Sequence, residues 1–280
     1  MVVADPPQPL ARWQCPDLAR AAVESGIVAS ISGTTIWRWL SSDAIKPWQH
    51  RSWIFPRDPD FGAKAARVLD LYGRRFNNTP LRPDEYVISA YEKTSIQARI
   101  CKHATTAPAP RRPLRVEAEY VRSGSLAYLA AWDVHHAKVF GRCEAATGID
   151  PFHRLVDQVM TSQPYASAHR VFWVVDNGSS HRGQPSIDRL QHRWPTLRLI
   201  HLPVHASWLN QVEIYFSVVQ RKVLAPDDFH TLNEVESRLL DFQQHYEQIA
   251  TRFEIKFTKD DLNALLERVA AHDADRTLAA

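Results

Sequence analysis

The pattern of apolar and polar positions divides the chain into a helical beginning, a strand-rich middle and a helical end. Residues 15–45 predict two short helices joined by a tight connection after Gly26, with Ser32 suited to cap the second helix. The apolar positions of that second helix are Ile36, Trp39 and Leu40. A further helix is expected over residues 61–76, before the pattern changes.

From Tyr86 onward the chain contains runs of β-branched and aromatic residues, which predict strands. The run 171–175 is continuously apolar and ends in Asp176, as in a central strand buried on both faces of a sheet. The other expected elements are strands at 86–92, 95–101, 126–134 and 197–203 and helices at 152–162, 185–194 and from Trp208. Strands that are first antiparallel and then alternate with helices predict a mixed α/β sheet.

The end of the chain is expected to be helical. Thr231 and Glu234 form a capping box, and apolar residues then recur at steps of three and four, as on one face of a helix. These residues are Leu232, Val235, Leu239, Phe242, Tyr246 and Ile249. A last helix is expected over 259–270. The predicted fold class is therefore α/β, a mixed sheet with flanking helices preceded by an all-α segment.

Length and composition exclude several classes of protein. The chain has 280 residues, 45% hydrophobic and 23% charged, which are ordinary globular values and exclude disorder along the whole chain. Apolar runs fall short of the ~20 residues of a spanning helix, and the N-terminus lacks the pattern of a secretory signal. Cys15, Cys101 and Cys143 are far apart, which argues against a zinc cluster and a disulfide framework and fits a reducing cytosol.

The distribution of charge is more informative than its sum. The chain has a net charge of +3, but residues 1–225 contain 28 basic and 19 acidic residues, whereas residues 226–280 contain 6 and 12. The densest basic stretch runs from Lys93 to Arg122 around the sequence APAPRRPLR. Lys93, Arg111, Arg112 and Arg115 are therefore candidate contacts to DNA phosphates. The alternative is a solvated loop without a role in DNA binding.

The second expected helix presents a polar surface. Its exposed side carries Thr34, Thr35, Trp37 and Arg38, and such side chains can hydrogen-bond to phosphates or base edges. Helix, tight connection and second helix form the helix-turn-helix pattern. The alternative is a small helical pair that packs on a core and contacts no DNA.

Two carboxylates stand at positions suited to a hard cation. Asp176 closes a buried strand, where side chains reach the crevice in which open α/β sheets bind ligands. Glu213 lies in the helix expected after Trp208, three residues after Asn210 and so on the same helical face. Mg²⁺ is commonly held by one or two carboxylates together with waters and phosphate oxygens. Each carboxylate also has an ordinary alternative, a turn cap for Asp176 and a favourable helix-dipole position for Glu213.

Two stretches of the sequence are similar to a known family. VVDNGSSHRG at 174–183 and LIHLPVHASWLNQVEIYFSVVQRKVL at 199–224 resemble the DDE transposases of the mariner superfamily, and within it the bacterial insertion-sequence six-thirty group. The 36 residues between Asp176 and Glu213 are near that family's usual interval. Further landmarks are EKTSIQAR at 92–99 and WIFPRDPDF at 53–61, within a resemblance that covers about 15–262.

The resemblance implies an RNase H-like core that cuts and rejoins DNA at insertion-sequence ends, with three carboxylates holding two Mg²⁺ or Mn²⁺ ions. Asp176 and Glu213 match the second and third acidic positions. Asn210, His181 and Asn177 match neighbours that position the site, with a surface-loop histidine as the alternative for His181. The implied partners are double-stranded DNA, as terminal inverted repeats and target, and a second copy of the chain. The implied location is the bacterial cytoplasm, at the nucleoid.

The first acidic position departs from the family. Where the family has an aspartate just before Glu-Lys, this chain has Tyr91 in SAYEKTSIQA. A phenol has a pKa near ~10 and is neutral near pH 7, so it is a poor ligand for a hard cation. Glu92 is expected to point away from Asp176, because successive strand residues face opposite sides. Asp133 is another candidate donor, with a strand-end turn residue as its alternative. We expect strand cleavage to be absent or severely weakened.

The expected organisation is a helix-turn-helix segment at 1–56, a linker helix at 57–85, an RNase H-like core at 86–225 and C-terminal helices at 226–280. Family members usually carry two helix-turn-helix units before the core. Only one fits here, so specific recognition of transposon ends is expected to be weaker. Three functions are open at this point: a transposase, a catalytically inactive DNA-binding relic or regulator, and an unrelated RNase H-like nuclease, which the paired motifs disfavour.

Overall fold

The structure is a computed structural model that describes residues 13–42, 56, 58–178, 180–181, 183–225 and 228–278. It divides into two compact units, Met1–Ile54 and Phe55–Ala280. Residues 1–12 and 43–55 of the expected helix-turn-helix segment at 1–56 lie outside the described residues. Residues 53–55 and 57 of the landmark at 53–61 lie outside them as well.

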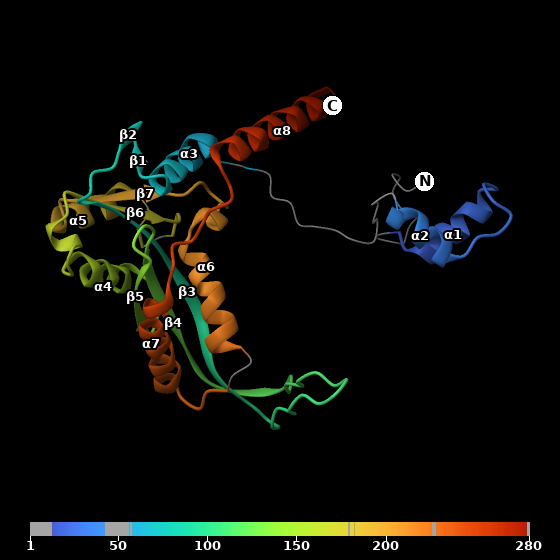
Figure 1. Cartoon of the computed structure of the whole chain (residues 1–280), viewed down its shortest axis with the longest axis horizontal. Coiled ribbons are helices and arrows are strands. Elements are labelled where there is room, and N and C mark those ends of the chain that lie inside the picture. The colour runs from blue at the N-terminus through green and yellow to red at the C-terminus, as the bar shows by residue number, and fades with distance from the viewer. Residues whose placement is uncertain are drawn as a thin grey trace. The chain divides into compact units, whose positions relative to one another are not determined.

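The first unit contains two helices, α1 (Cys15–Glu24) and α2 (Gly33–Ser42) (Figure 1). Its small core holds Trp13, Leu18 and Leu40, with Ala21 and Ile36 packed against them. The expectation that Trp39 is an inward position is wrong, because its side chain is 55% exposed. Among the described residues, the ten-residue helix α2 packs on α1 and Trp13, which bury only a narrow stripe of it, and Trp39 lies outside that stripe.

The second unit is built on a five-stranded sheet with the order β5-β4-β3-β6-β7. The first three strands pair antiparallel, and β6 and β7 run parallel to β3. Their bounds are β3 Glu85–Cys101, β4 Tyr120–Asp133, β5 Lys138–Glu144, β6 Arg170–Val175 and β7 Leu197–His201. A separate two-stranded sheet pairs β1 (Arg75–Phe76) with β2 (Thr79–Pro80). The expected mixed sheet is therefore present.

The sheet differs from the sequence expectation in two respects. The runs 86–92 and 95–101 belong to one strand, β3, which continues through an irregularity between Lys93 and Ile96, where Ser95 adopts φ 56°. Strand β5 follows β4 after a tight turn and was not expected. The expected strand 126–134 is extended backward to Tyr120.

Helices cover both faces of this sheet. On one face α4 (Ile149–Met160) and α5 (Gln184–Arg193) share a core with Ile88, Trp173 and Val175. On the other face lie α3 (Phe61–Tyr72), α6 (Val212–Val219), which continues as a π-helical turn over Gln220–Leu224, and α7 (Leu232–Ile249) (Figure 1). Short 3₁₀ turns span Tyr165–Ser167 and Ser207–Leu209, and α8 is Lys259–Leu278.

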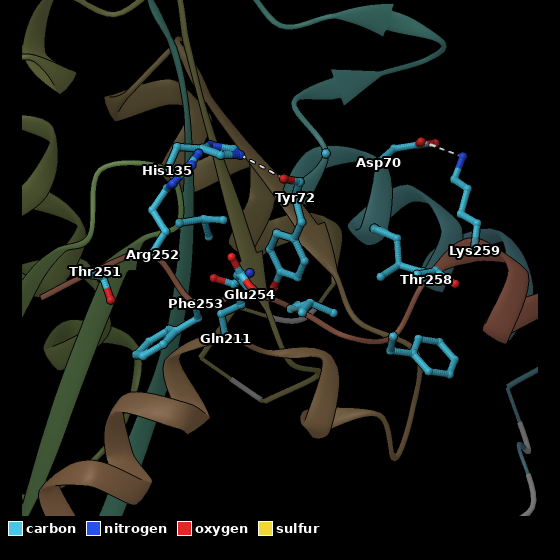
Figure 2. Close-up of a pocket in the computed structure, with 15 residues that line it drawn as sticks. Asp70, Tyr72, His135, Gln211, Thr251, Arg252, Phe253, Glu254, Thr258 and Lys259 are labelled. Carbon is cyan, nitrogen blue, oxygen red and sulfur yellow. Dashed lines mark hydrogen bonds and ion pairs between the residues drawn. The ribbon is translucent and has the colours of Figure 1, made fainter.

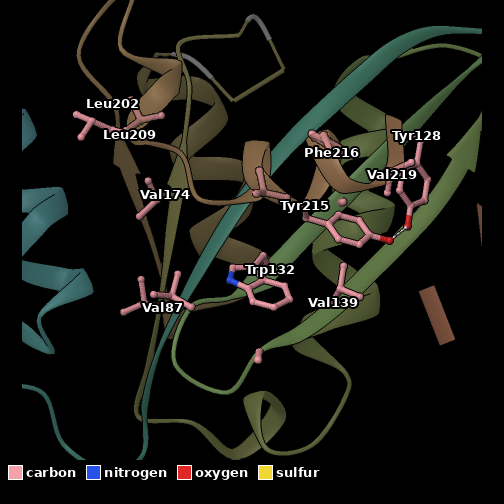
Figure 3. Packing of buried hydrophobic residues seen from close by; sticks show 14 of the residues in the cluster. Val87, Tyr128, Trp132, Val139, Val174, Leu202, Leu209, Tyr215, Phe216 and Val219 are labelled. Carbon is pink, nitrogen blue, oxygen red and sulfur yellow. Dashed lines mark hydrogen bonds between the residues drawn. The ribbon is translucent and has the colours of Figure 1, made fainter. Parts of the chain in front are cut away.

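Side chains of β6 alternate between these two cores, as the pleat of a strand requires. Phe172 and Val174 join the α3/α6/α7 side, and Trp173 joins the other. Figure 3 shows the α6 side, where the Tyr128 and Tyr215 hydroxyls lie 3.0 Å apart within the apolar cluster. The continuous apolar run therefore marks a central strand buried on both faces, as expected.

The C-terminal helices follow the sequence pattern closely at their start. Thr231 Oγ1 accepts from the Glu234 backbone N–H, as the N-cap half of a capping box predicts, but the Glu234 side chain accepts from the His230 N–H rather than from that of Thr231. Along α7, Val235, Leu239 and Tyr246 are buried, whereas Ile249 at its end is 57% exposed. Among the described residues, no helix combines the length and apolar character needed to cross a bilayer.

Candidate active site

Tyr91 and Asp176 occupy neighbouring positions at the centre of the sheet. The parallel strands β3 and β6 pair Ser89 with Val174. The same register, continued by two residues, sets Tyr91 beside Asp176, which directly follows β6. The Tyr91 ring leans toward Phe216 of α6, with 6.3 Å between ring centroids.

Three carboxylates lie near the Tyr91 phenol and affect its pKa. Burial raises the pKa of the phenol, and the negative charges of Asp176, Glu213 and Glu92 raise it further. The structure therefore brings together the three residues that the sequence placed at the acidic positions, Tyr91, Asp176 and Glu213, and adds Glu92. At neutral pH the phenol is protonated and contributes no negative charge to this group.

Asp176 is held by its own turn. Its Oδ1 accepts from His181 Nε2 at 2.5 Å and from the Gly178 backbone N–H at 2.9 Å. Burial acts to raise the pKa of this carboxyl, but the hydrogen bonds from His181 and Gly178 outweigh it, and the pKa is lowered. Asp176 is therefore ionised at neutral pH, and the DNGSSH sequence supplies the groups that keep it so.

His181 is buried, with 2% of its surface exposed, so it is not the surface-loop residue of the alternative interpretation. Its ring lies 4.8 Å from that of Phe152 on α4, and its Nδ1 lies 3.0 Å from Ser180 Oγ. The His201 ring donates from Nε2 to the His181 carbonyl at 2.8 Å. His181 is thus fixed on three sides while it contacts Asp176.

Asn177 ties the same turn to the next strand. Its Nδ2 donates to the Leu202 carbonyl, just beyond β7, at 2.8 Å. The backbone after Asp176 is thereby anchored to a second strand end rather than left as an open loop.

Glu92 lies close to Asp176, so the expectation that it faces away from the site is wrong. Tyr91, Glu92, Asp176 and His181 all line one pocket of about 250 Å³. The pleat does send Tyr91 and Glu92 to opposite sides of β3, toward α6 and toward His181. Asp176, however, stands beyond the end of β6 and is reached from both sides. Burial raises the pKa of Glu92, and the Asp176 charge also raises it.

Glu213 is placed by contacts that precede its helix. Asn210 Nδ2 donates to the Ala90 carbonyl at 2.9 Å, and Asn210 Oδ1 accepts from the Ser89 hydroxyl. Ser89 Oγ in turn accepts from the Val212 N–H at 2.9 Å. The first turn of α6 is therefore fastened to β3, one residue from Tyr91.

Asn210 does not lie on the helix, contrary to the expectation that it shares a helical face with Glu213. It ends the 3₁₀ turn Ser207–Leu209, in extended backbone, and α6 begins at Val212. The Glu213 N–H still donates to the Asn210 carbonyl at 3.0 Å. Burial raises the pKa of Glu213, Lys93 lowers it, and Asp176 raises it.

Tyr72, Ser89 and Ser180 are parts of this network that the sequence did not mark. Tyr72 Oη, at the end of α3, donates to the Leu209 carbonyl at 2.9 Å. No local pattern distinguishes such residues, because each contacts a partner that is distant in sequence. Only the DNGSSH motif itself pointed to the neighbourhood of Ser180.

Asp133 is a turn residue, as its ordinary interpretation held. Its buried carboxylate accepts from the backbone N–H groups of His135 and His136 at 3.0 and 3.1 Å and from Tyr165 Oη at 2.7 Å. These partners occupy it fully within the turn that follows β4, so it supplies no third carboxylate.

The donor set does not fit two divalent cations. Asp176 and Glu213 supply two carboxylates, the Glu92 carboxylate accepts a hydrogen bond from the Ser180 hydroxyl on the other side of β3, and Tyr91 places a neutral phenol where the resemblance implies a carboxylate. Across the part of the chain that the structure describes, no group of three or more His, Cys, Asp or Glu side chains is arranged to hold a metal ion. One oxygen of Asp176 already accepts two hydrogen bonds.

The proposed DNA-contacting residues fall on three surfaces. On α2, Thr34, Trp37 and Arg38 are exposed, whereas Thr35 is partly buried and its hydroxyl lies 3.0 Å from Ser32 Oγ. Ser32 also accepts from the Thr35 N–H at 3.2 Å, so it caps α2 as expected.

Arg111, Arg112 and Arg115 lie on an arm between β3 and β4, where isolated bridges pair Ala109 with Arg112 and Thr106 with Arg115. All three arginine side chains are exposed. The arm is thus a hairpin-like extension of the sheet, with Arg111 at its tip in left-handed backbone, φ 61°. Lys93 is not on this arm, because its charge acts on Glu213 at the candidate site.

Comparison with known proteins identifies the family. Residues 92–236, more than half of the chain, match the DDE superfamily endonuclease family. The matched segment begins directly after Tyr91 and contains both Asp176 and Glu213. Among curated proteins no match was found.

Several solved structures share the fold. A Mos1 mariner paired-end complex with Mn superposes with a TM-score of 0.54 at 14% identity, covering 95% of this chain and 79% of that chain. A pre-cleavage Mos1 transpososome gives 0.53 at 15% identity, covering 97% and 81%. A Mos1 strand transfer complex gives 0.53 at 14% identity, covering 92% and 72%. These matches confirm the expected RNase H-like mixed sheet with flanking helices and preceding α-helices. The chain belongs to the DDE superfamily endonucleases.

Proposed function

We propose that this chain is an insertion-sequence transposase of the mariner type in which strand cleavage is absent or severely weakened. One observation carries the proposal: a neutral tyrosine stands beside Asp176 and Glu213, where a third carboxylate is expected. The alternative, a DNA-binding relic or regulator of transposition, shares this site and differs only in having no residual cleavage. The six-thirty assignment rests on the sequence motifs.

The chemistry of the site supports this proposal. Phosphodiester cleavage with two metal ions requires ligands that fix both ions against the attacking and leaving oxygens. The donors present at Tyr91, Asp176 and Glu213 do not form that set. Tyr91 is also unsuited to attack phosphorus itself, because burial and three neighbouring carboxylates disfavour its phenolate.

DNA remains the proposed partner, as terminal inverted repeats and target. The support is the exposed arginines of the arm, the exposed polar side of α2 and the resemblance to a family that acts on DNA ends. A homodimer on paired ends and a cytoplasmic, nucleoid-associated location belong to the same proposal.

The decisive experiment restores the missing carboxylate. Cleavage of a labelled terminal inverted repeat is measured with Mg²⁺ and with Mn²⁺ for the native chain, Tyr91→Asp and Tyr91→Phe. We expect no detectable cleavage by the native chain or by Tyr91→Phe, and at least roughly hundredfold more product from Tyr91→Asp, equivalent to about 2.7 kcal/mol of transition-state stabilisation. Asp176→Asn in the Tyr91→Asp background should abolish that product. Robust native cleavage that Tyr91→Asp leaves unaltered would overturn the proposal.

DNA binding is tested separately from cleavage. Replacing Arg111, Arg112 and Arg115 with alanine should weaken binding to all duplex sequences and flatten its salt dependence, by about 0.9 in the log–log slope for each phosphate that the arm no longer neutralises. Lys138→Ala, far from the arm, is the control. An unchanged slope would remove the arm from the DNA-binding surface.

A further inference from the structure

A cavity of about 890 Å³ lies between α3 and the segment that joins α7 to α8. Figure 2 shows Arg252 and Glu254 along one side of it, with His135 and Tyr72 opposite. Small-molecule sites have volumes of roughly 300–1,000 Å³, so the cavity has the size of such a site. It shares no lining residue with the pocket beside Asp176. The cavity is therefore a site separate from the two carboxylates.

Aromatic contacts fix one wall of this cavity. Phe253 stacks on Trp132 with 4.5 Å between ring centroids, and Phe257 meets Trp208 edge to face at 4.8 Å. Further apolar lining residues are Leu69, Val134 and Ile255. Small-molecule sites combine such apolar walls with a few polar groups that fix the orientation of the ligand.

Two polar side chains of the lining have an acceptor without a partner. Gln211 is 2% exposed, and its Oε1 has no hydrogen-bond partner among the described residues. His135 Nε2 lies 3.1 Å from the Tyr72 carbonyl, which only accepts, so Nε2 is the donor. Burial lowers the pKa of His135, so the ring is neutral at pH 7 and its Nδ1 is an acceptor, also without a described partner. Because buried polar groups are ordinarily paired, a ligand of this cavity must bring hydrogen-bond donors.

The charged residues that line the cavity balance one another. Asp70 Oδ1 is paired with Lys259 Nζ at 2.6 Å. Arg252 and Glu254 are both exposed and opposite in sign. A charged ligand inside the cavity would lack a fixed counter-charge among the described lining residues, and burying an unpaired charge is costly. The donors of the ligand are therefore neutral.

Neutral N–H donors on a flat apolar body are characteristic of amino-substituted heterocycles, whose exocyclic amine is not protonated at neutral pH. The carboxamide of Gln211 narrows this class, because it offers the acceptor Oε1 and the donor Nε2 side by side. Its complement is an amine next to a ring nitrogen, as in the bidentate contact between glutamine and adenine.

We propose that the cavity binds a neutral nucleoside whose base carries an amine beside a ring nitrogen. The amine donates to Gln211 Oε1, the ring nitrogen accepts from Gln211 Nε2, and a further N–H or hydroxyl of the ligand donates to His135 Nδ1. The inference goes beyond the proposed function, since it requires neither DNA nor cleavage.

The cavity borders the segment that leads into α6. The Ile214 N–H donates to the Gln211 carbonyl at 3.0 Å, and Tyr72 Oη donates to the Leu209 carbonyl at 2.9 Å. Two lining residues, Gln211 and Tyr72, thus hold the backbone just before and after the start of this helix. A bound nucleoside therefore contacts the segment that positions Glu213.

Ligand binding is tested with nucleosides that differ at one group. Isothermal titration calorimetry of the full chain, without DNA, is measured with adenosine, with purine riboside, which lacks the amine, and with inosine, which has an oxygen in its place. Adenosine should bind with a dissociation constant below about 1 mM. Purine riboside and inosine should bind at least roughly tenfold more weakly, because Gln211 Oε1 then has no donor or faces another acceptor.

Three variants separate hydrogen bonding from shape. Gln211→Leu should weaken adenosine binding roughly tenfold and remove the advantage of adenosine over purine riboside, whereas a residue that only shapes the cavity would weaken both alike. Gln184→Leu, at a glutamine of α5 outside the cavity, is the control. Ile255→Trp fills the cavity and should abolish binding of all three nucleosides. Circular dichroism checks that each variant is folded.

The comparison of adenosine with purine riboside on the native chain needs no variant. Equal affinity for the two, or no binding of adenosine, would refute the proposal. The same holds if Gln211→Leu retains the native preference for adenosine. Binding of a single-stranded oligodeoxyadenylate without binding of adenosine would mean that the site takes a base only as part of a nucleic acid, which also contradicts it. None of these results bears on cleavage or on the arm.

Discussion

The two carboxylates of the candidate site are held in different ways. Asp176 is fixed by groups that follow it within five residues, Gly178 and His181, in the turn that its own motif forms. Glu213 is fixed indirectly, through Asn210 and Ser89, whose hydrogen bonds join residues 120 and 121 positions apart. One carboxylate therefore belongs to a local structure and the other to a tertiary one.

This difference has an electrostatic counterpart. Hydrogen-bond donors surround Asp176 and lower its pKa despite burial. No residue that the structure describes donates a hydrogen bond to the Glu213 carboxylate, and burial raises its pKa. The local turn is thus preorganised for a negative charge. The tertiary contacts at α6 set the position of Glu213 and leave its charge weakly compensated, by Lys93.

The largest effect is expected from breaking the tertiary anchor. Asn210→Ala removes the donor to the Ala90 carbonyl and the acceptor of the Ser89 hydroxyl in a buried site, which should lower the free energy of unfolding by about 3 kcal/mol. Asn177→Ala, the matched asparagine of the local turn, loses one partly buried bond to Leu202 and should cost about 1 kcal/mol. Urea denaturation of both variants measures the difference. Equal losses would contradict the distinction between the two anchors.

A smaller effect on thermal stability is expected when the charge of either carboxylate is removed. Its sign should differ between Asp176 and Glu213. The lowered pKa of Asp176 stabilises the fold above its ordinary value of 3.8, and this stability is lost as pH falls further. The raised pKa of Glu213 penalises the fold once pH rises above its ordinary value of 4.5 and has no effect well below it. At pH 7, Asp176→Asn should therefore lower Tm and Glu213→Gln should raise it, each by about 2 °C.

Thermal unfolding at pH 7 and at pH 3 tests both signs. At the lower pH the Glu213→Gln effect should vanish and the Asp176→Asn effect should shrink. A Tm change of the same sign for both variants at pH 7 would show that the two carboxylates share one environment after all.

The same contrast between local and tertiary contacts explains how much of the fold and of the candidate site the sequence predicts. The run 171–175, the DNGSSH turn and the N-cap at Thr231 are local patterns, and each corresponds to the observed structure. The alternation of side chains along β3 predicts Glu92 away from Asp176 only for a residue within β6, whereas Asp176 follows the end of β6 and lines one pocket with both Tyr91 and Glu92. Ser89 and Tyr72 carry no local signal at all, since their roles depend on partners brought together by the sheet.

The smallest effect is expected at Ser180, which lies between the Asp176 turn and Glu92 of β3. Its hydroxyl lies 3.0 Å from His181 Nδ1 and 3.3 Å from Glu92 Oε1, so it connects the Asp176 turn to the carboxyl that the sequence placed elsewhere. Burial raises the pKa of Glu92, and the hydrogen bond from Ser180 opposes that rise. Ser180→Ala should therefore raise the pKa of Glu92 further and leave Asp176 ionised at neutral pH, because Asp176 keeps its bonds from His181 and Gly178. Carboxyl carbon shifts followed by NMR from pH 3 to 8 report both groups, with Ser167→Ala, an exposed serine distant from the site, as the control. A lowered Glu92 pKa, or a matching rise at Asp176, would mean that Ser180 serves the local turn alone and that Glu92 stands outside the network.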